Sequence, residues 1–244
     1  MAAVSLFPIG ILHSCFKEKF GVPRQSMMVS EATGVLKLHE DARFKLALNH
    51  LNEFSHIWIL YLFHKNIEKG WKPTVQTPRI EAPDSVGVFA SRSPHRPNPI
   101  GMSLVKLVKI DFEAAGGIEL HLSGVDILDQ TPVIDIKPYL PFADACAEAN
   151  TGWAREEIKK YRVEYSAKAL EQIERQFRNR HHDLKLLLTQ MLELDPRPTS
   201  QRLSTPMEAP GSQGKPFAFR LFDFDVKWEI RNSTVFVHSL EPLS

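Results

Sequence analysis

The segment from Ala90 to Met102, Ala-Ser-Arg-Ser-Pro-His-Arg-Pro-Asn-Pro-Ile-Gly-Met, constrains the fold more than any other part of the chain. Pro97 and Pro99 fix their own φ angles and push the preceding residues toward extended conformations. The segment therefore cannot form a helix or a strand in the middle of a sheet. A stiff cationic loop between the apolar runs Val86–Ala90 and Met102–Ile110 is preorganised to bind an anion, because its ordering entropy is spent in folding. A solvated, proline-rich surface loop explains the pattern equally well.

The first two-thirds of the chain contain a series of apolar runs that are typical of β-strands. Strands are predicted at Ile9–Ser14, Val35–His39, Ile57–His64, Met102–Phe112, Ile118–Ser123 and Pro132–Tyr139. Ile57–His64 is apolar at nearly every position, which predicts burial on both faces. One helix, Ala42–Asn52 with Asp41 as its cap, interrupts the series, and Ala115-Gly116-Gly117 predicts a hairpin turn. Strands that follow one another without helices favour an antiparallel or mixed barrel over a doubly wound sheet.

A change of composition near Ala143–Thr151 separates this mainly β part from a C-terminal α+β part. In the C-terminal part, helices are predicted around Leu170–Phe177 and Leu184–Met191 with a break at Asn179–Asp183, then a mobile polar loop at Ser200–Gly214, and strands at Phe217–Ile230 and Thr234–Leu240. We therefore expect a barrel domain at residues 1–145, a connecting segment at 146–165 and a small α+β domain at 166–244.

Composition and short motifs argue against several classes of protein. The net charge is +1, so binding to RNA would require a local basic patch. The longest apolar run, Ile57–Phe63, is too short to span a membrane, and Met1–Pro8 lacks the features of a signal peptide. Cys15 and Cys146 are expected to be free thiols in a reducing cytosol. The sequence has no P-loop, no Gly-x-Gly-x-x-Gly and no histidine pair at metal-ligand spacing, so no metal is expected.

Four polar clusters follow or interrupt the apolar runs, as functional loops often do. They are Gly21–Gln25, His64-Lys65, the segment Ala90–Met102 and Asp126–Asp129, which leads into Asp135–Tyr139. Ala90–Met102 is called the proline-arginine segment below. Taken singly, each cluster also has a purely structural explanation, such as a strand end in solvent, an Asx turn or a cross-strand ion pair.

Together these clusters resemble the TrmO-type tRNA (adenine-N6)-methyltransferases, also called the TsaA-like or YaeB family. The matching motifs are Phe20–Gln25, Glu53–Leu60, Ser91–Gly101 and Asp129–Tyr139, with Asp195–Pro198 and Phe224–Trp228 resembling the tail of bacterial members. The resemblance implies a β-barrel that binds S-adenosylmethionine without a Rossmann fold, in a cytoplasmic homodimer. It also implies methylation of N6-threonylcarbamoyladenosine at position 37, in the anticodon loop of threonine tRNA.

Carried over position by position, the resemblance implies a cofactor site. Its residues would be Pro23, Arg24, Gln25, His64, Lys65, Arg92, Met102, Asp126, Ile127, Leu128 and Asp129. The guanidinium of Arg24 or Arg92 suits the carboxylate of the cofactor, and Asp126 or Asp129 suits its ribose hydroxyls.

The roles outside the cofactor site follow from the chemistry that the substrate requires. Asp135 is expected to take the proton from N6, with Lys137 orienting it or binding the threonyl carboxylate. His95, Arg96 and Arg197 are expected to contact the tRNA. Two alternatives stay open: a non-catalytic RNA-binding or adaptor protein on the same barrel, and an enzyme that uses the cofactor on a small molecule.

Overall fold

A closed barrel of six strands forms the larger part of the molecule. The structure is a computed structural model that describes residues 4–77, 85–154, 158–177 and 183–243. The barrel order is β1 (Gly10–Ser14), β2 (Thr33–Leu38), β7 (Glu119–Ser123), β6 (Ile100–Asp111), β3 (His56–Leu62) and β8 (Thr131–Pro138). Every neighbouring pair is antiparallel, and β1 closes the ring because it pairs with both β2 and β8. The predicted mainly β barrel is confirmed.

The barrel strands bury one face each. In β3, Ile57, Ile59 and Tyr61 are buried, whereas the residues between them are partly exposed. The prediction that Ile57–His64 is buried on both faces is therefore wrong. Alternate side chains of a barrel strand point into the core, and the others point outward, where apolar residues are only partly covered.

Local backbone conformation corrects the predicted helix. Asp41 caps α1 (Ala42–Ala47) by accepting a hydrogen bond from the backbone N–H of Arg43 at 2.9 Å, as predicted. The helix ends before Asn52, because His50 has a φ of 65° and a short 3-10 helix, η1 (Leu51–Glu53), follows. A left-handed residue cannot continue an α-helix.

The connection between β3 and β6 lies outside the barrel. It contains η2 (His64–Lys69), β4 (Thr74–Gln76), β5 (Ser85–Gly87) and η3 (Val88–Ala90), and β4 and β5 form a two-stranded antiparallel sheet. The apolar run Val86–Ala90 is thus divided between β5 and η3, and the proline-arginine segment connects a 3-10 helix to a barrel strand. After β8 come α2 (Pro141–Asp144) and η4 (Gly152–Ala154).

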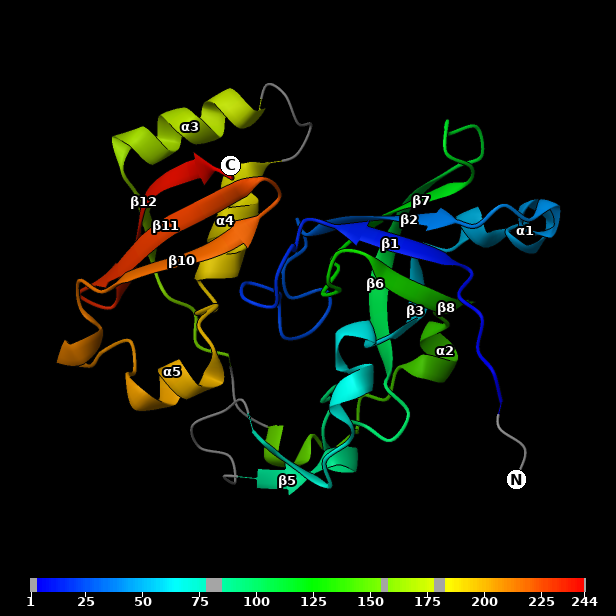
Figure 1. Cartoon of the computed structure of the whole chain (residues 1–244), viewed down its shortest axis with the longest axis horizontal. Helices are drawn as coiled ribbons and strands as arrows, with labels where there is room; N and C mark the ends of the chain where they lie inside the picture. The colour runs from blue at the N-terminus through cyan, green and yellow to red at the C-terminus, as the bar shows by residue number, and fades with distance from the viewer. Residues whose placement is uncertain (1–3, 78–84, 155–157, 178–182, 244) are drawn as a thin grey trace.

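The C-terminal part forms a second sheet with its own helices, to the left of the barrel in Figure 1. The sheet order is β10 (Pro216–Leu221), β11 (Phe224–Arg231), β12 (Thr234–Pro242) and β9 (Val163–Tyr165). The helices are α3 (Ala167–Phe177), α4 (Leu184–Leu192), α5 (Thr199–Ser204) and the 3-10 helix η5 (Pro210–Ser212).

The structure changes three details predicted for this part. The strand predicted at Phe217–Ile230 is two strands, because Phe222 has a φ of 53° and turns the chain. The predicted loop at Ser200–Gly214 contains most of α5 and all of η5. The predicted connecting segment 146–165 supplies β9, which pairs parallel with β12. Of the break predicted at Asn179–Asp183, residues 179–182 lie outside the described residues.

The residues that follow β1, numbers 15–31, join the barrel to the C-terminal sheet. The backbone N–H of Phe222 donates to the carbonyl of Cys15 at 2.8 Å, and Phe16 and Leu221 form an antiparallel bridge. Further along, the side-chain amide of Gln190 in α4 donates to Ser30 Oγ at 2.9 Å. Buried side chains of both parts form one continuous core. Among the described residues, no helix has the length and apolarity to cross a membrane.

Gly101 has a steric role that can be tested. It pairs with Tyr61 across β6 and β3, and a Cβ at this position would lie 2.4 Å from the Tyr61 ring. We expect Gly101→Ala to lower the free energy of unfolding by about 1–3 kcal/mol, the usual cost of overpacking. Gly87→Ala is the control, because its Cβ would meet nothing within 4 Å, and it should stay within about 0.5 kcal/mol of the unmodified chain. Equal values for the two variants in chemical denaturation would contradict this role.

Candidate functional site

Two neighbouring cavities open at one rim of the barrel. The first, called the Arg92 cavity, has a volume of about 300 Å³, and the second, the His64 cavity, has about 180 Å³. The Arg92 cavity is lined by Pro23, Arg24, Gln25, Ser91, Arg92, Arg96, Ile100, Gly101 and Met102. The His64 cavity is lined by Lys19, Val22, Leu62, His64, Lys65, Asn66, Pro94, Ile127, Leu128 and Thr131. Tyr61, Phe63 and Asp126 line both, so the two cavities share a wall.

Antiparallel pairing explains why these residues meet. The C-terminal ends of β1, β3 and β7 and the N-terminal ends of β2, β6 and β8 all lie at the same rim. The loops at these ends contain the four polar clusters: Gly21–Gln25, His64-Lys65, the proline-arginine segment and Asp126–Asp129. Motifs separated by up to a hundred residues in sequence, such as Pro23 and Asp126, therefore converge on one site.

Asp126 is the acidic residue among the lining residues of the two cavities. Its carboxylate accepts a hydrogen bond from Ser103 Oγ at 2.5 Å, and Ser103 is itself only 2 % exposed. Burial raises the pKa of Asp126 above its usual value, and the hydrogen bond from Ser103 and the charge of Arg92 oppose this rise. The hydroxyl of Tyr61 lies 3.4 Å from Ser103 Oγ, so Ser103 contacts both Tyr61 and Asp126.

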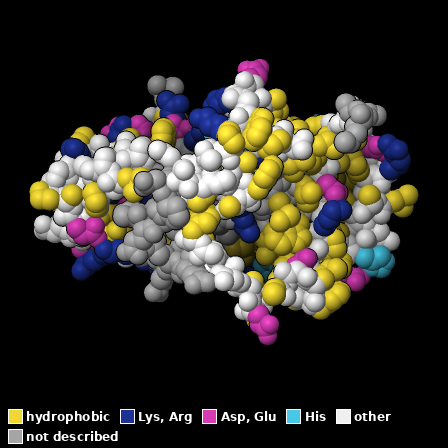
Figure 2. Space-filling view, turned by 90° about the horizontal axis from the view of Figure 1, so that it is seen from below, with side chains coloured by type: hydrophobic (Ala, Val, Ile, Leu, Met, Phe, Trp, Pro, Cys, Tyr) yellow, Lys and Arg dark blue, Asp and Glu magenta, His cyan; other side chains and the backbone are white. Residues whose placement is uncertain are grey.

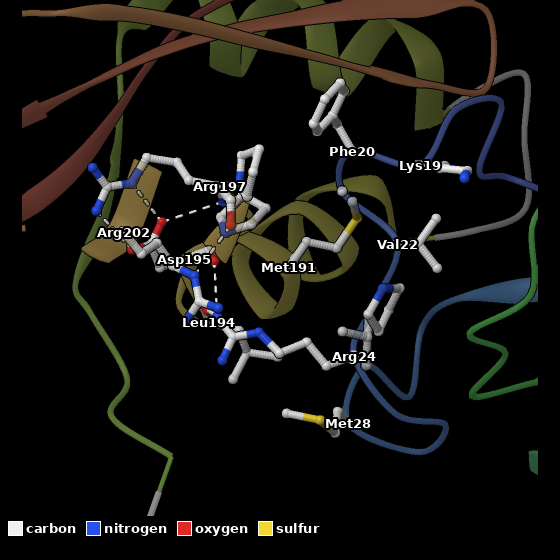
Figure 3. A pocket seen from close by; sticks show the side chains of 15 residues that line it. Lys19, Phe20, Val22, Arg24, Met28, Met191, Leu194, Asp195, Arg197 and Arg202 are labelled. Atoms are coloured by element: carbon white, nitrogen blue, oxygen red, sulfur yellow. Dashed lines mark hydrogen bonds and ion pairs between the residues drawn. The ribbon is translucent and has the colours of Figure 1, made fainter. Parts of the chain in front are cut away.

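The guanidinium of Arg92 is a cationic group at the wall of the Arg92 cavity. Its Nη1 donates to the side-chain oxygen of Gln25, and the side-chain amide of Gln25 donates to the carbonyl of Arg24 at 2.6 Å. Arg24 is placed differently from the expectation. Although it contributes to the cavity wall, its guanidinium donates to the carbonyls of Leu194 and Asp195 in the C-terminal part, both at 3.3 Å (Figure 3).

Three basic side chains line the His64 cavity. His64, Lys65 and Lys19 line it, and the ammonium of Lys19 donates to the side-chain oxygen of Asn66 at 3.3 Å. Burial, and then the charge of Lys65, lower the pKa of His64 below its usual value. At neutral pH this histidine is therefore a neutral polar group beside two cations.

Ten of the eleven residues predicted for the cofactor site line these two cavities, and Asp129 does not. The Asp129 carboxylate accepts hydrogen bonds from the backbone N–H of Ser14 at 2.9 Å and from Lys17 Nζ at 2.7 Å. It fixes the end of β1, so its side chain is committed to the barrel.

The predicted catalytic pair also lies elsewhere. Asp135 and Lys137 form an exposed ion pair at 3.0 Å on the outward face of β8. Asp135 lines a different cavity, with Ile9, Phe44 and other residues near α1. Within one chain, the structure does not bring this pair to the Arg92 or His64 cavity.

The residues predicted to contact tRNA are mostly committed to internal contacts. The prediction for Arg197 is wrong, because its side chain is 1 % exposed and its Nη2 lies 2.8 Å from the Asp195 carboxylate. Arg96 donates to the carbonyls of Val88 at 3.1 Å and Ser91 at 2.7 Å, so it stiffens its own loop. Burial, and then the charge of Lys72, lower the pKa of His95, which lies near Asn66.

Sequence reasoning missed three residues of the shared wall and its support. Tyr61 and Phe63 pack edge to face with ring centres 5.3 Å apart, and Ser103 orients Asp126. All three residues lie within apolar runs, and these runs predicted strands of the core but no role in the site. The pairing of Gly101 with a large ring on the next strand becomes visible only when the register is known.

Comparisons with known proteins identify the family of the chain. The model of the tRNA-methyltransferase O N-terminal domain matches residues 11–145, and that of the TrmO C-terminal domain matches residues 158–243. The chain is 39 % identical over 244 residues to the tRNA (adenine(37)-N6)-methyltransferase of Escherichia coli K12, covering 99 % of this chain and 100 % of that protein.

Two further relatives come from Pseudomonas aeruginosa. One is named a putative S-adenosylmethionine-dependent methyltransferase and is 41 % identical, covering 92 % of this chain and 91 % of that protein. The other is a crystal structure of TrmO, with a TM-score of 0.79, 36 % identity and coverage of 98 % of both chains. The resemblance carried by the four motifs is thus confirmed over the whole length, and the chain belongs to the TrmO family of tRNA methyltransferases.

Proposed function

We propose that the Arg92 and His64 cavities together bind S-adenosylmethionine, and that the chain uses it to methylate N6 of adenosine 37 in tRNA, the position named for its Escherichia coli relative. The proposed substrate form is N6-threonylcarbamoyladenosine in threonine tRNA. One observation carries the proposal: residues from all four polar clusters line two cavities that share Tyr61, Phe63 and Asp126.

The residues present suit each part of this cofactor. Arg92 matches the methionine carboxylate by charge and by its two-donor geometry. The faces of Tyr61 and Phe63 suit a sulfonium cation. Asp126 can accept hydrogen bonds from ribose hydroxyls, since Asp129 is engaged by Lys17. When bound, the cofactor supplies an electrophilic methyl group.

The residues of this chain then contribute positioning. Methyl transfer is an in-line displacement, so holding N6 behind the methyl group accounts for much of the rate. Lys19 and Lys65 line the His64 cavity and offer cations to the threonyl carboxylate. A catalytic role for Asp135 and Lys137 requires the homodimer, because within one chain neither residue lines the two cavities.

The proposed homodimer has a surface that fits it. Large apolar side chains of the barrel part are exposed, among them Met102 at 52 % and Phe142 at 87 %. Figure 2, which views the molecule from below Figure 1, shows hydrophobic side chains gathered over the barrel half of that face. Faces of this kind mark contacts with other proteins. We place the homodimer in the cytoplasm, with its tRNA substrate.

Arg92→Ala tests the cofactor site. Loss of a charge-assisted contact should weaken binding of S-adenosylmethionine by about 10- to 150-fold in isothermal titration, equivalent to about 1.5–3 kcal/mol. Arg175→Ala serves as the control, because Arg175 pairs with Glu171 on the exposed face of α3. If a folded Arg92→Ala protein bound S-adenosylmethionine as tightly as the unmodified chain, the assignment of Arg92 to the cofactor site would be wrong.

Asp126→Asn should change the free energy of unfolding and the affinity for S-adenosylmethionine in opposite directions. Burial raises the pKa of Asp126 in the folded chain, so stability of the unmodified chain falls as pH rises through that pKa. The amide cannot ionise, so the variant should be more stable at pH 7 and yet bind the cofactor more weakly. Asp111→Asn should do the opposite to stability, because hydrogen bonds from the Glu113 backbone and from Lys109 lower the pKa of Asp111. A less stable Asp126→Asn protein in denaturation at pH 7 would contradict this account.

The choice of substrate can be tested with two RNA transcripts. The ureido N–H of threonylcarbamoyladenosine loses its proton more easily than an adenine amine, and its carboxylate adds an ionic contact. We therefore expect methyl transfer to threonine tRNA carrying this group to be on the order of 10²-fold faster, or more, than to unmodified tRNA. Comparable rates on the two transcripts would show that the carboxylate is not recognised.

A further inference from the structure

The cofactor segment Pro23–Gln25 is tied to the C-terminal part by one side chain. Arg24 extends from this segment, and its Nη2 donates to the carbonyl oxygens of Leu194 and Asp195 (Figure 3). Leu194 precedes and Asp195 begins the turn Asp195-Pro196-Arg197-Pro198 that follows α4, called the 195–198 turn below. A residue of the candidate site is thus held by a group about 170 positions away in sequence.

The 195–198 turn holds an uncommon shape by means of an ion pair. Asp195 has a φ of 51°, in the left-handed region that most residues avoid. Its carboxylate accepts hydrogen bonds from Nε and Nη2 of Arg197, both at 2.8 Å, and both side chains are almost fully buried. Arg197 Nη1 also donates to the carbonyl of Thr205 at 2.9 Å. These contacts fix the direction of the Asp195 carbonyl, and strain of this kind persists only where the surroundings determine it.

On the barrel side, the same segment orients Arg92. Gln25 bridges two partners: its amide donates to the Arg24 carbonyl, and its side-chain oxygen accepts from Arg92. A continuous path of hydrogen bonds therefore runs from Arg197 through Asp195, Arg24 and Gln25 to Arg92.

Arg24 lines a cavity between the segment and the C-terminal part. This cavity of about 270 Å³ lies where the segment meets the turn, lined from one side by Phe20, Val22 and Met28 and from the other by Met191 and Leu194. Next to this space Gly21 packs closely, since a Cβ there would lie 2.9 Å from the Phe219 ring, and Val22 packs against the core. The hydrogen bonds from Arg24 add a polar connection from the segment to the turn.

We propose that the Asp195–Arg197 ion pair is a positioning element for cofactor binding, which sets the place of Arg92 through Arg24 and Gln25. The inference rests on the proposed function, since it takes the Arg92 cavity as the cofactor site. Neither Asp195 nor Arg197 touches the cofactor in this account. The C-terminal part thereby contributes to cofactor affinity from outside the barrel.

Isothermal titration with S-adenosylmethionine on the full chain tests the proposal. The variant Asp195→Asn/Arg197→Gln replaces both charges, so that neither is left buried alone. We expect it to bind about 5-fold more weakly or worse, the usual scale of coupling between sites. Glu171→Gln/Arg175→Gln is the matched control, because it neutralises an exposed ion pair on α3 of the same part and should bind normally.

Combining variants distinguishes positioning from general damage. If the turn acts through Arg24, adding Asp195→Asn/Arg197→Gln to Arg24→Gln should cause no further loss of affinity. In steady-state assays the loss should appear in KM for the cofactor, with kcat at saturating cofactor retained. Should the paired variant not fold, Arg197→Lys replaces it, because it keeps the charge and loses the two-donor geometry.

The outcomes separate the two proposals. Normal affinity in the folded turn variant, or a loss that adds fully to that of Arg24→Gln, overturns the positioning role. Normal affinity in Arg92→Ala instead overturns the cofactor site itself. A loss in Arg92→Ala together with a non-additive loss in the turn variants supports both.

Discussion

The arrangement of this molecule depends on how residues 15–31, between β1 and β2, are held on two sides. Backbone hydrogen bonding from Phe222 to Cys15 joins their beginning to the C-terminal sheet, and Gln190 holds their end. Pro23–Gln25, in the middle, forms a wall of the Arg92 cavity. One connection therefore sets both the contact between the two sheets and the shape of the candidate site. A displacement of residues 15–31 at the C-terminal sheet would therefore also move the wall of the Arg92 cavity.

Closure of the barrel supplies the rest of the site. Since β1 pairs with both β2 and β8, the strand ends form a ring, and loops distant in sequence meet at one rim. The cost of this arrangement is visible at Asp126, a partly buried residue at the shared wall of the cavities whose pKa is raised by desolvation. A group that burial disfavours in its charged form is expected where a ligand will later supply its hydrogen-bond partners.

Sequence reasoning predicted the barrel, and ten of the eleven residues that it proposed for the cofactor site line the two cavities, because alternation of apolar side chains and motif resemblance both carry local information. It could not predict which polar groups are satisfied within the chain. Arg197, between two prolines, has the pattern of an exposed basic turn, yet Asp195 two residues earlier pairs with it and buries it. Asp129 and Asp126 are equivalent in the sequence pattern, and only the folded chain shows that Lys17 pairs with Asp129. The same limit applies to the strand break at Phe222, which depends on a positive φ at a residue that rarely adopts one.

The central claim is that the cofactor site and the C-terminal turn form one coupled unit through residues 15–31. Amide hydrogen exchange with and without S-adenosylmethionine measures this most directly, because it reports local opening along the whole chain. The account predicts slower exchange with cofactor both at Val22–Ser26 and Val125–Leu128 and at Leu194–Arg197. Protection confined to the barrel loops, with Leu194–Arg197 unchanged, would contradict the coupling. Absence of any change at Val22–Ser26 and Val125–Leu128 would contradict the site itself.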